Sequence, residues 1–554
     1  MDIQVKTPES VPTDEEKKGE VDVGPNQLVQ SEPWTDDSSF IQRRHLRSRH
    51  IAFIGLGGGI GVGLFVGVGK GLQAAGPLGL LLAFMIMGAI MWGVLQGAAE
   101  MATLVPTAGG FPHFASRFID PAAGFALGWT YAIGYALSVA SELSACALVM
   151  NYWSNLNAAV WIAVFSVPFL AINMIGVKYY GETEVVTASI KVVTLVGLII
   201  LGLVIDLGGA PNHDRLGFRY WKNPGAMVEF EGVGGGSLAR FLSFFNVLSC
   251  ISAFISAAFS YTGTESVILA AGEATNPTKQ IPKAAKRVMW RIIVFYVLGV
   301  LIIGMIVPYT EPRLLGGTSN AASSPWVIAI EHSGIKVLPH IINAVILTSA
   351  WSAGNTYVWV ASRTLYSLAL QNQAPKFFAK LTKKGVPWLC VLAVWAVGLL
   401  SFLSAGSGGA SAAFTWLQNL TALAALNAWC LIAFASARMR QAFKKQQVPL
   451  TSMPFKAPGS PWVQFTSALL CAIIIVCSGF PVFIKGNWNT ADFFASYISL
   501  GILIVPWIGY KVFKRSSFVR SADADLYSGR IKAGEEFEEQ PATSAFGRVL
   551  DKLF

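Results

Sequence analysis

Long apolar segments alternate with short polar connections along almost the whole chain. Segments of this length and hydrophobicity are what a helix needs to cross the hydrocarbon core of a bilayer. Twelve such segments occur, at residues 51–75, 79–104, 122–150, 157–176, 186–206, 242–271, 288–308, 335–369, 387–405, 411–436, 462–484 and 491–513. The pattern predicts an all-α polytopic membrane protein with twelve transmembrane helices.

The first apolar segment contains a glycine-rich stretch that cannot form a regular helix. Residues 55–69 are GLGGGIGVGLFVGVG, with no charge and no proline. Each glycine costs about 1 kcal/mol of helix propensity, and broken backbone at membrane depth must line a cavity or be buried in protein. The stretch therefore predicts a discontinuous helix at a substrate site. Helix packing through pairs such as Gly57 and Gly61 is the alternative, although here the glycines lie on every face.

A second break is predicted in the sixth segment. Residues 259–273, FSYTGTESVILAAGE, place a glycine, two threonines and a glutamate inside a hydrophobic run. This break lies five segments after the first one, and interrupted helices at matching positions of two halves indicate an inverted repeat. We therefore expect a 5+5 inverted-repeat core with broken helices 1 and 6, followed by two C-terminal helices.

The composition and the charge distribution agree with a membrane protein. The chain has 554 residues, of which 53% are hydrophobic and 13% charged, and its net charge is +10. Most cations lie between apolar segments, so they are topology signals and do not indicate a nucleic-acid surface. The basic connections are RRHLRSRH before the first segment, KQIPKAAKRVMWR after the sixth, residues 376–384 after the eighth and RMRQAFKK after the tenth. Both termini are therefore expected in the cytoplasm.

These signals divide the chain into six parts. They are a disordered cytoplasmic tail (1–42), the first repeat with helices 1–5 (43–206), an extracellular loop (207–241), the second repeat with helices 6–10 (242–436), helices 11 and 12 (437–513), and a cytoplasmic C-terminal tail (514–554). The first tail is polar and proline-containing, as is typical of disorder, and lacks a signal-peptide pattern. Its candidate modification sites are Lys6, Lys17 and Lys18, and ubiquitin-ligase adaptors are candidate partners of the tails.

Three ionisable residues lie well inside apolar segments and are therefore candidates for function. Glu142 lies in the third segment, Lys191 lies one turn into the fifth, and Glu265 lies in the predicted break of the sixth. Groups held out of water in this way can exchange a proton near neutral pH. The alternatives are structural hydrogen bonds for the carboxyls and snorkelling to the interface for the lysine. Three charges nearer the segment ends are interpreted as interfacial anchors: Lys70, Glu100 and Arg363.

The sequence does not indicate a cofactor, a metal site or an enzyme. The six cysteines lie in or beside apolar segments without a CxxC pair, so neither a disulfide framework nor a metal site is indicated. No GxGxxG register fits the glycine-rich stretch, and no nucleophile–base motif occurs.

Several motifs, in order, make the chain resemble the fungal amino acid permeases of the amino acid–polyamine–organocation superfamily, the yeast amino acid transporter family. They are GGGIGVGLFVG at 57–67, GGF at 109–111, RFID at 117–120, GFRYWKNPGA at 217–226, FSYTGTE at 259–265, AAGEATNPTKQIPKAAKRV at 270–288, SAGNTYVWVASRTLYSLALQNQAPKFF at 352–378 and FKAPGSP at 455–461. The resemblance covers roughly residues 43–460. It implies an alternating-access carrier in the plasma membrane that takes up L-amino acids with protons and is driven by the proton gradient without a cofactor.

Residue by residue, the resemblance also implies a substrate site. Backbone NH groups of the first break would bind the substrate carboxylate, as a half-helix N-terminus attracts anions; they belong to Gly59, Ile60, Gly61, Val62 and Gly63. Carbonyls of the second break would bind the ammonium; they belong to Ser260, Tyr261 and Gly263. Phe259 matches an aromatic gate, and Glu142 matches a glutamate near the substrate.

The same resemblance implies a proton-coupling site. Lys191 matches a fifth-helix lysine whose ammonium, in proton-coupled relatives, takes the place that sodium fills in related transporters. Asn355 and Thr356 would face this ammonium, while Glu142 and Glu265 are the next candidates to carry the proton.

Two departures and the loop at 209–225 bear on the substrate. Val62 stands where the family usually has threonine or serine, so one hydroxyl for the carboxylate is missing, and the sequence around Thr421 drifts from the tenth-helix pattern. The loop resembles permeases with a broad or dicarboxylic preference, so a broad or neutral/acidic preference is expected. The alternatives are an exchanger without proton coupling and a sensor of the same fold that does not transport, although such sensors carry a longer N-terminal extension.

Overall fold

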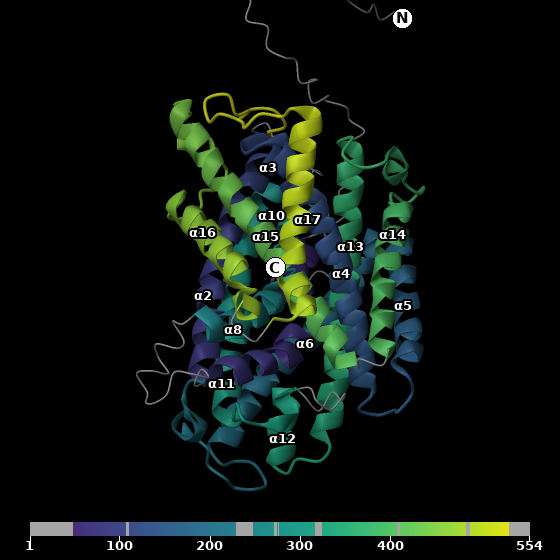
Figure 1. Ribbon diagram of the computed structural model, residues 1–554, viewed down its shortest axis with the longest axis vertical. Coiled ribbons are helices and arrows are strands. Elements are labelled where there is room, and N and C mark those ends of the chain that lie inside the picture. Colours follow the sequence, from purple (N-terminus) through teal and green to yellow (C-terminus); the bar gives the residue numbers. More distant parts are fainter. Residues whose placement is uncertain are drawn as a thin grey trace, which may run out of the picture. The chain divides into compact units, whose positions relative to one another are not determined.

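The computed structural model describes residues 48–106, 110–228, 247–270, 274, 276–315, 324–406, 410–483 and 488–530, and the regular elements within these ranges are helices (Figure 1). Eight helices of this described part are long and apolar enough to cross a membrane, and α16 (Trp462–Cys477) is a shorter apolar helix. The all-α membrane fold is therefore confirmed. The count of twelve spans, the repeat and the domain boundaries stay predictions, and the N-terminal tail lies outside the described residues.

The first half of the chain contains the predicted first break and four of the eight described helices that are long and apolar enough to cross a membrane. Its elements are α1 (Ser48–Phe53), η2 (Ile54–Gly58), η3 (Gly63–Gly67), α2 (Val68–Leu104), α3 (Gly110–Phe118), α4 (Pro121–Met150), α5 (Ala158–Ile175), α6 (Val177–Asp206) and η4 (Trp221–Gly225). α2 changes direction at Gly76, whose φ of 75° is left-handed and is followed by Pro77. Glycine adopts this conformation without a Cβ clash, and proline suits the first turn of the helix that follows. α2 therefore contains the end of the first predicted span and all of the second.

The second half of the chain begins with the other predicted break. Its elements are α8 (Val247–Tyr261), α9 (Ser266–Leu269), α10 (Pro277–Arg291), η6 (Ile292–Leu298), α11 (Gly299–Ile306), η7 (Pro312–Leu315), α12 (Pro325–His332), α13 (Leu338–Leu370), η9 (Lys376–Ala379), α14 (Trp388–Gly398), η10 (Leu399–Ala405), α15 (Ala410–Lys445), η11 (Leu450–Ser452), α16, η12 (Phe480–Phe483) and α17 (Thr490–Lys514). α10, η6 and α11 follow one another without a gap, so they form one long stretch.

α4 is the helix on which most of the bundle packs. It contacts α13, α15, α17, α3, α14 and α5. Asp120 caps its first turn by accepting a hydrogen bond from the Ala122 N–H at 2.9 Å, and Pro121 occupies the first helical position. Both features favour helix initiation. α5, α6 and α17 expose large apolar side chains such as Val167, Val193 and Val505, as expected for helices that face lipid.

The segment that follows α17 folds back onto the helices at the same end of the bundle (Figure 1). The Val519 N–H donates to the Ile119 carbonyl at 2.9 Å, and Lys511 lies 2.5 Å from an Asp120 carboxylate oxygen. Arg117 forms an ion pair with Asp525 at 3.2 Å. Residues 515–530 of the predicted C-terminal tail are thus part of the packed structure.

Glu100 corrects one expectation from the sequence. It was expected at the interface, but its side chain is fully buried and is paired with Arg440 of α15. The Ala457 N–H donates to the same carboxylate at 3.0 Å. The polar segment between α15 and α16 therefore folds over this part of α2. Removing either partner of a buried ion pair destabilises the fold, because the remaining charge is left in the interior without compensation.

We expect Arg440→Met to destabilise the fold by about 3–5 kcal/mol, because it leaves the Glu100 carboxylate buried without its cation. The measurement is the unfolding temperature of the purified protein in detergent. The double variant Glu100→Gln/Arg440→Met should recover much of the loss, since it buries no charge. Equal melting of the wild type and the single variant would contradict the assignment.

Candidate functional site

The glycine-rich stretch is broken as a helix at residues 59–62. η2 ends at Gly58, η3 begins at Gly63, and the four residues between them are non-helical and buried. The Ile60 N–H turns back to the Gly57 carbonyl at 2.9 Å. The Ile60 carbonyl accepts a hydrogen bond from Ser349 Oγ of α13 at 3.0 Å. A neighbouring helix therefore satisfies a carbonyl that the break removes from the helix ladder.

The sixth span is broken at residues 262–265, between α8 and α9. Gly263 has a φ of 87°, which a residue with a side chain rarely adopts. The Thr262 carbonyl accepts a hydrogen bond from the Tyr357 hydroxyl at 3.3 Å. The carbonyls of Tyr261 and Gly263 each accept a backbone N–H within the turn, both at 3.1 Å.

The two breaks pack directly against each other, backbone to backbone. A Cβ on Gly59 would lie 2.9 Å from the Thr264 nitrogen and 3.0 Å from the Gly263 carbonyl carbon. A Cβ on Gly63 would lie 2.8 Å from the Ser260 Cα. Glycine is required at these positions because it permits the close backbone approach. The glycine-rich stretch therefore both interrupts the first span and allows close packing. The sequence analysis had treated these two roles as alternatives.

Glu142 brings a carboxylate to the first break. Its side chain is buried in α4, and one carboxylate oxygen accepts a long hydrogen bond, 3.5 Å, from the Val62 N–H. The other oxygen occupies the place that a Cβ on Gly61 would take. A carboxyl group thus lies against a backbone N–H of the break, at the start of a half-helix where acceptors are favoured.

The aromatic residues of the sixth span point in different directions. The Phe259 ring meets Phe414 of α15 edge to face at 6.1 Å, and lies 3.1 Å from the place of a Gly63 Cβ. The Tyr261 ring instead stacks on Tyr296 at 4.5 Å, and its hydroxyl donates to a carbonyl of α2. The Phe259 side chain therefore lies at the first break, while that of Tyr261 supports the helices behind the second.

Lys191 is fully buried, with a relative exposure of 0%. Its ammonium donates to the Gly57 carbonyl at 3.0 Å and lies 3.8 Å from an oxygen of Glu184. This geometry excludes snorkelling to the interface. The Thr356 hydroxyl donates to Glu184 at 3.4 Å, so Thr356 is linked to Lys191 indirectly, through that carboxylate.

Asn355 has other partners than the expected lysine. Its amide donates to the Trp351 carbonyl at 3.2 Å and accepts a hydrogen bond from Asn173 at 3.2 Å. Those contacts link α13 to itself and to α5. The described contacts of Asn355 thus indicate a packing role.

Glu265 lies in the second break, as expected, and faces α4. One of its oxygens accepts a hydrogen bond from the Tyr135 hydroxyl at 2.6 Å and another from Tyr131 at 3.4 Å. Neutral donors thus stabilise one oxygen of this buried carboxyl, while Oε2 accepts no hydrogen bond in the described part of the chain. This arrangement favours the structural alternative for Glu265 over a role as a freely titrating group.

Glu184 and Arg291 are two buried residues that the sequence analysis did not assign to the site. Arg291 was counted with the basic cytoplasmic connection, but it is 1% exposed. It donates to the Gly55 carbonyl of η2 at 2.7 Å and to the Thr264 hydroxyl, so it links the helix before the first break to the second break. The available signals were positional: Arg291 falls inside the predicted seventh span, and Glu184 lies seven residues, about two helical turns, before Lys191.

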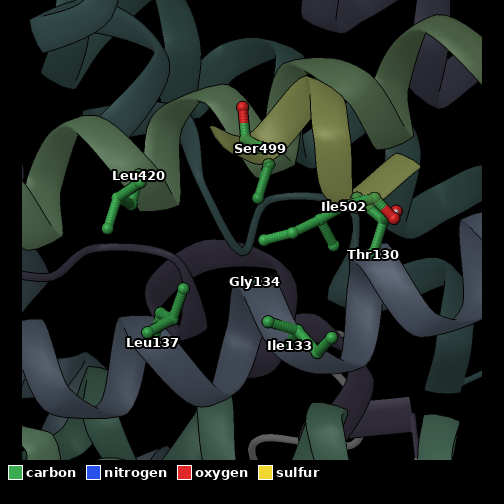
Figure 2. Close-up of a pocket in the computed structure, with 8 residues that line it drawn as sticks. Thr130, Ile133, Gly134, Leu137, Leu420, Ser499 and Ile502 are labelled. Atoms are coloured by element: carbon green, nitrogen blue, oxygen red, sulfur yellow. Dashed lines mark hydrogen bonds between the residues drawn. The ribbon is translucent and has the colours of Figure 1, made fainter. Parts of the chain in front are cut away.

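Two small hollows lie beside α4 on the side of α15. One is lined by Thr262 of the second break, Tyr135 and Thr421 among others. The second lies between α4, α15 and α17, where Ile133, Leu137, Leu420 and Ile502 project into the same space (Figure 2). The surface exposed in both hollows is apolar, so neither suits a charged ligand as it stands.

Comparisons with known proteins point to one family. The family model described as "Amino acid permease" matches residues 50–522. The dicarboxylic amino acid permease of Saccharomyces cerevisiae is 37% identical over 99% of this chain and 91% of its own length. The proline-specific permease of Emericella nidulans is 40% identical, with 90% and 91% covered. The lysine-specific permease of Saccharomyces cerevisiae is 41% identical, with 88% and 79% covered. A solved manganese transporter of Eremococcus coleocola, 13% identical, has a TM-score of 0.52 over 87% of this chain and 96% of its own, which shows a shared fold alone.

We expect Gly59→Ala to destabilise the protein by about 1–3 kcal/mol, because the added methyl group forces the two breaks apart. The matched control is Gly197→Ala in α6, where a Cβ has no other heavy atom within 4 Å. Thermal unfolding of both purified variants gives the comparison. If Gly59→Ala and Gly197→Ala unfold at the same temperature, the two breaks do not pack as described.

Proposed function

Because the chain belongs to the amino acid permease family, we propose that it is a plasma-membrane symporter that carries L-amino acids into the cell together with protons. The observation that carries this proposal is the contact between two broken helices beside buried ionisable groups. Backbone groups freed at such breaks bind substrates in secondary transporters. Buried acids and bases are needed for a proton to influence the conformation.

The substrate carboxylate is bound by NH groups of residues 59–63. These groups stand at the beginning of η3, where the helix dipole favours an anion. The contact between Glu142 and the Val62 N–H supports this choice, because it is already a carboxylate–backbone contact. The missing hydroxyl at Val62 leaves the backbone as the main source of donors there.

The substrate ammonium is bound by carbonyls of the second break. Ser260, Tyr261 and Gly263 are the proposed residues. The Tyr261 carbonyl accepts one hydrogen bond within the turn, from the Thr264 N–H, and its second lone pair can accept the ammonium. The Gly263 carbonyl already accepts from both the N–H and the hydroxyl of Ser266, so there the ammonium replaces the hydroxyl while the backbone turn stays in place.

Substrate selectivity is set by side chains around the breaks, since backbone contacts recognise only what L-amino acids share. Glu142 and Phe259 lie against glycines of the first break, and Phe414 packs on Phe259. Relatives of similar identity are named for dicarboxylic amino acids, proline and lysine, so overall identity does not decide the substrate. We propose a broad or neutral/acidic preference, in line with the loop at 209–225.

Lys191 couples the proton to the conformational change. When protonated it binds the Gly57 carbonyl at the end of η2 and thereby holds the first half of span one against α6. Loss of the proton weakens this bond, because hydrogen bonds from a charged donor are about twice as strong as neutral ones. The carrier is then free to adopt its other state, and coupling requires only that the two states differ in proton affinity.

The function is tested by uptake of labelled amino acids into a permease-deficient cell at acidic and at neutral external pH. We expect uptake that is faster at acidic pH and that collapses when the proton gradient is removed. Gly61→Val should abolish uptake, because its side chain would collide with Glu142, while Gly197→Val should transport normally. Uptake that does not depend on the proton gradient would indicate an exchanger. Binding of amino acids without uptake would indicate a sensor.

Lys191→Arg should abolish pH-driven accumulation, because arginine keeps its charge throughout this range. Lys191→Ala should do the same, and any remaining exchange should no longer respond to external pH. Both variants are compared with the wild type at equal surface abundance. Normal accumulation by Lys191→Arg would place the coupling proton elsewhere.

A further inference from the structure

A buried carboxylate stands directly beside the proposed coupling lysine. The Glu184 side chain is 2% exposed, and its Oε1 lies 3.8 Å from the Lys191 ammonium. Oε1 accepts no hydrogen bond in the described part of the chain. Oε2 is held by Ser352 Oγ at 2.8 Å and by Thr356 Oγ1 at 3.4 Å. One oxygen is thus fixed by α13, and the other is open on the side of the lysine.

The cytoplasmic half of the first span covers this pair. A Cβ on Gly57 or Gly58 would lie 3.6 or 3.8 Å from Glu184 Oε1. The Gly57 carbonyl is also the acceptor for Lys191. Any movement of η2 away from α6 would therefore uncover the carboxylate and remove the carbonyl acceptor of the lysine together.

The remaining titratable and charged groups around the pair come from four elements: α6, α1, α4 and α10. On α6 itself Glu182 is 45% exposed, and α1 supplies its partner His50 at 3.2 Å. Tyr180 of α6 donates to Thr356 of α13 at 3.2 Å. Glu142 of α4 and Arg291 of α10 act on Lys191 electrostatically. Of the three acidic residues Glu142, Glu182 and Glu184, it is Glu184 that lies within ion-pair distance of the Lys191 ammonium in the described part of the chain.

Glu184 also lies nearer to the end of the membrane-spanning helix. It precedes Lys191 by seven residues, which is about 10 Å along a helix axis. Its neighbour Glu182 is partly exposed and contacts the beginning of α1. This end of α6 is the one that the charge pattern assigns to the cytoplasm.

We propose that Glu184 is the group that accepts the coupling proton from Lys191 and passes it to the cytoplasm. The step rests on the proposed symport. The proton leaves Lys191 Nζ and bonds to Glu184 Oε1, so an ammonium and a carboxylate become an amine and a carboxylic acid. No other reactant is needed, and the net charge of the pair stays zero. The proton then leaves Glu184 for water when η2 moves aside, which restores the carboxylate.

The transfer has a direct mechanical consequence. A neutral amine holds the Gly57 carbonyl less strongly than an ammonium does. Proton transfer therefore loosens η2, and the same movement opens Glu184 to water. An ion pair in a dry interior also pays a desolvation penalty, so the neutral pair is an accessible state in the closed conformation.

The test compares the ratio of uptake at acidic and neutral external pH in the wild type, Glu184→Gln, Glu184→Asp and Glu182→Gln, at equal surface abundance. In Glu184→Gln the ratio falls to about 1, because an amide cannot take up the proton. Glu184→Asp keeps a ratio above that of Glu184→Gln. Glu182→Gln, the neighbouring control, keeps the wild-type ratio.

The outcomes separate this inference from the proposed function. A wild type without any pH dependence refutes the symport itself. A pH-dependent wild type with an unchanged ratio in Glu184→Gln, even at lower overall uptake, refutes only the role of Glu184, since a structural residue would lower both rates alike.

A second variant keeps the inference falsifiable if Glu184→Gln does not reach the surface. Ser352→Ala removes a hydrogen bond that stabilises the ionised carboxylate. We expect the midpoint of the pH dependence of uptake to move to higher pH. A midpoint that stays in place while the variant transports would overturn the proposal.

Discussion

The backbone contact between the two broken spans is the constraint on which the rest of the structure depends. Carbonyls freed in a bilayer must find partners within the protein, because each unsatisfied group costs several kcal/mol. In this chain other helices provide them. Ser349 donates to Ile60, Tyr357 to Thr262, Arg291 to Gly55 and Lys191 to Gly57. The breaks therefore fix where α6, α10 and α13 stand.

The two cations that bind carbonyls of η2 have different physical characters. Lys191 binds the Gly57 carbonyl near the C-terminal end of η2, where the helix dipole favours positive charge. Arg291 binds the Gly55 carbonyl near its beginning, and because it cannot lose its proton, its contacts with Gly55 and Thr264 form a permanent link between η2 and the second break. Lys191 can lose its proton, and it alone of the two has an acidic partner, Glu184, within the described residues. In the proposed mechanism, Arg291 is thus a fixed link and Lys191 is the residue that changes its charge.

The sequence predicts the features whose causes are local. A glycine run breaks a helix wherever it occurs, and Glu142 and Lys191 stand out because their sequence neighbours are apolar. Contacts between distant segments could not be predicted in this way. Arg440 lies 340 residues from its partner Glu100 in the sequence. Asn355 was expected to face Lys191, but it accepts a hydrogen bond from Asn173. The fifth apolar segment was predicted from residue 186, whereas the helix α6 begins at Val177. Its first turns contain Glu182 and Glu184, and the pairing of Glu184 with Lys191 is what makes a buried carboxylate tolerable there.

The position of Glu142 links substrate binding to protonation in a second way. Its carboxylate already lies at the Val62 N–H, which belongs to the set of donors proposed for the substrate. Two carboxylates at the same donors repel each other strongly where water is excluded. On the proposed binding mode, we expect the substrate to bind when Glu142 is protonated or has turned aside; protonation would tie amino acid affinity to the proton by linkage. A substrate with an acidic side chain would bring a second carboxylate to Glu142, so a preference for such substrates would require a protonated Glu142. The charge state of this one residue of α4 would then govern both how tightly and how selectively the first break binds.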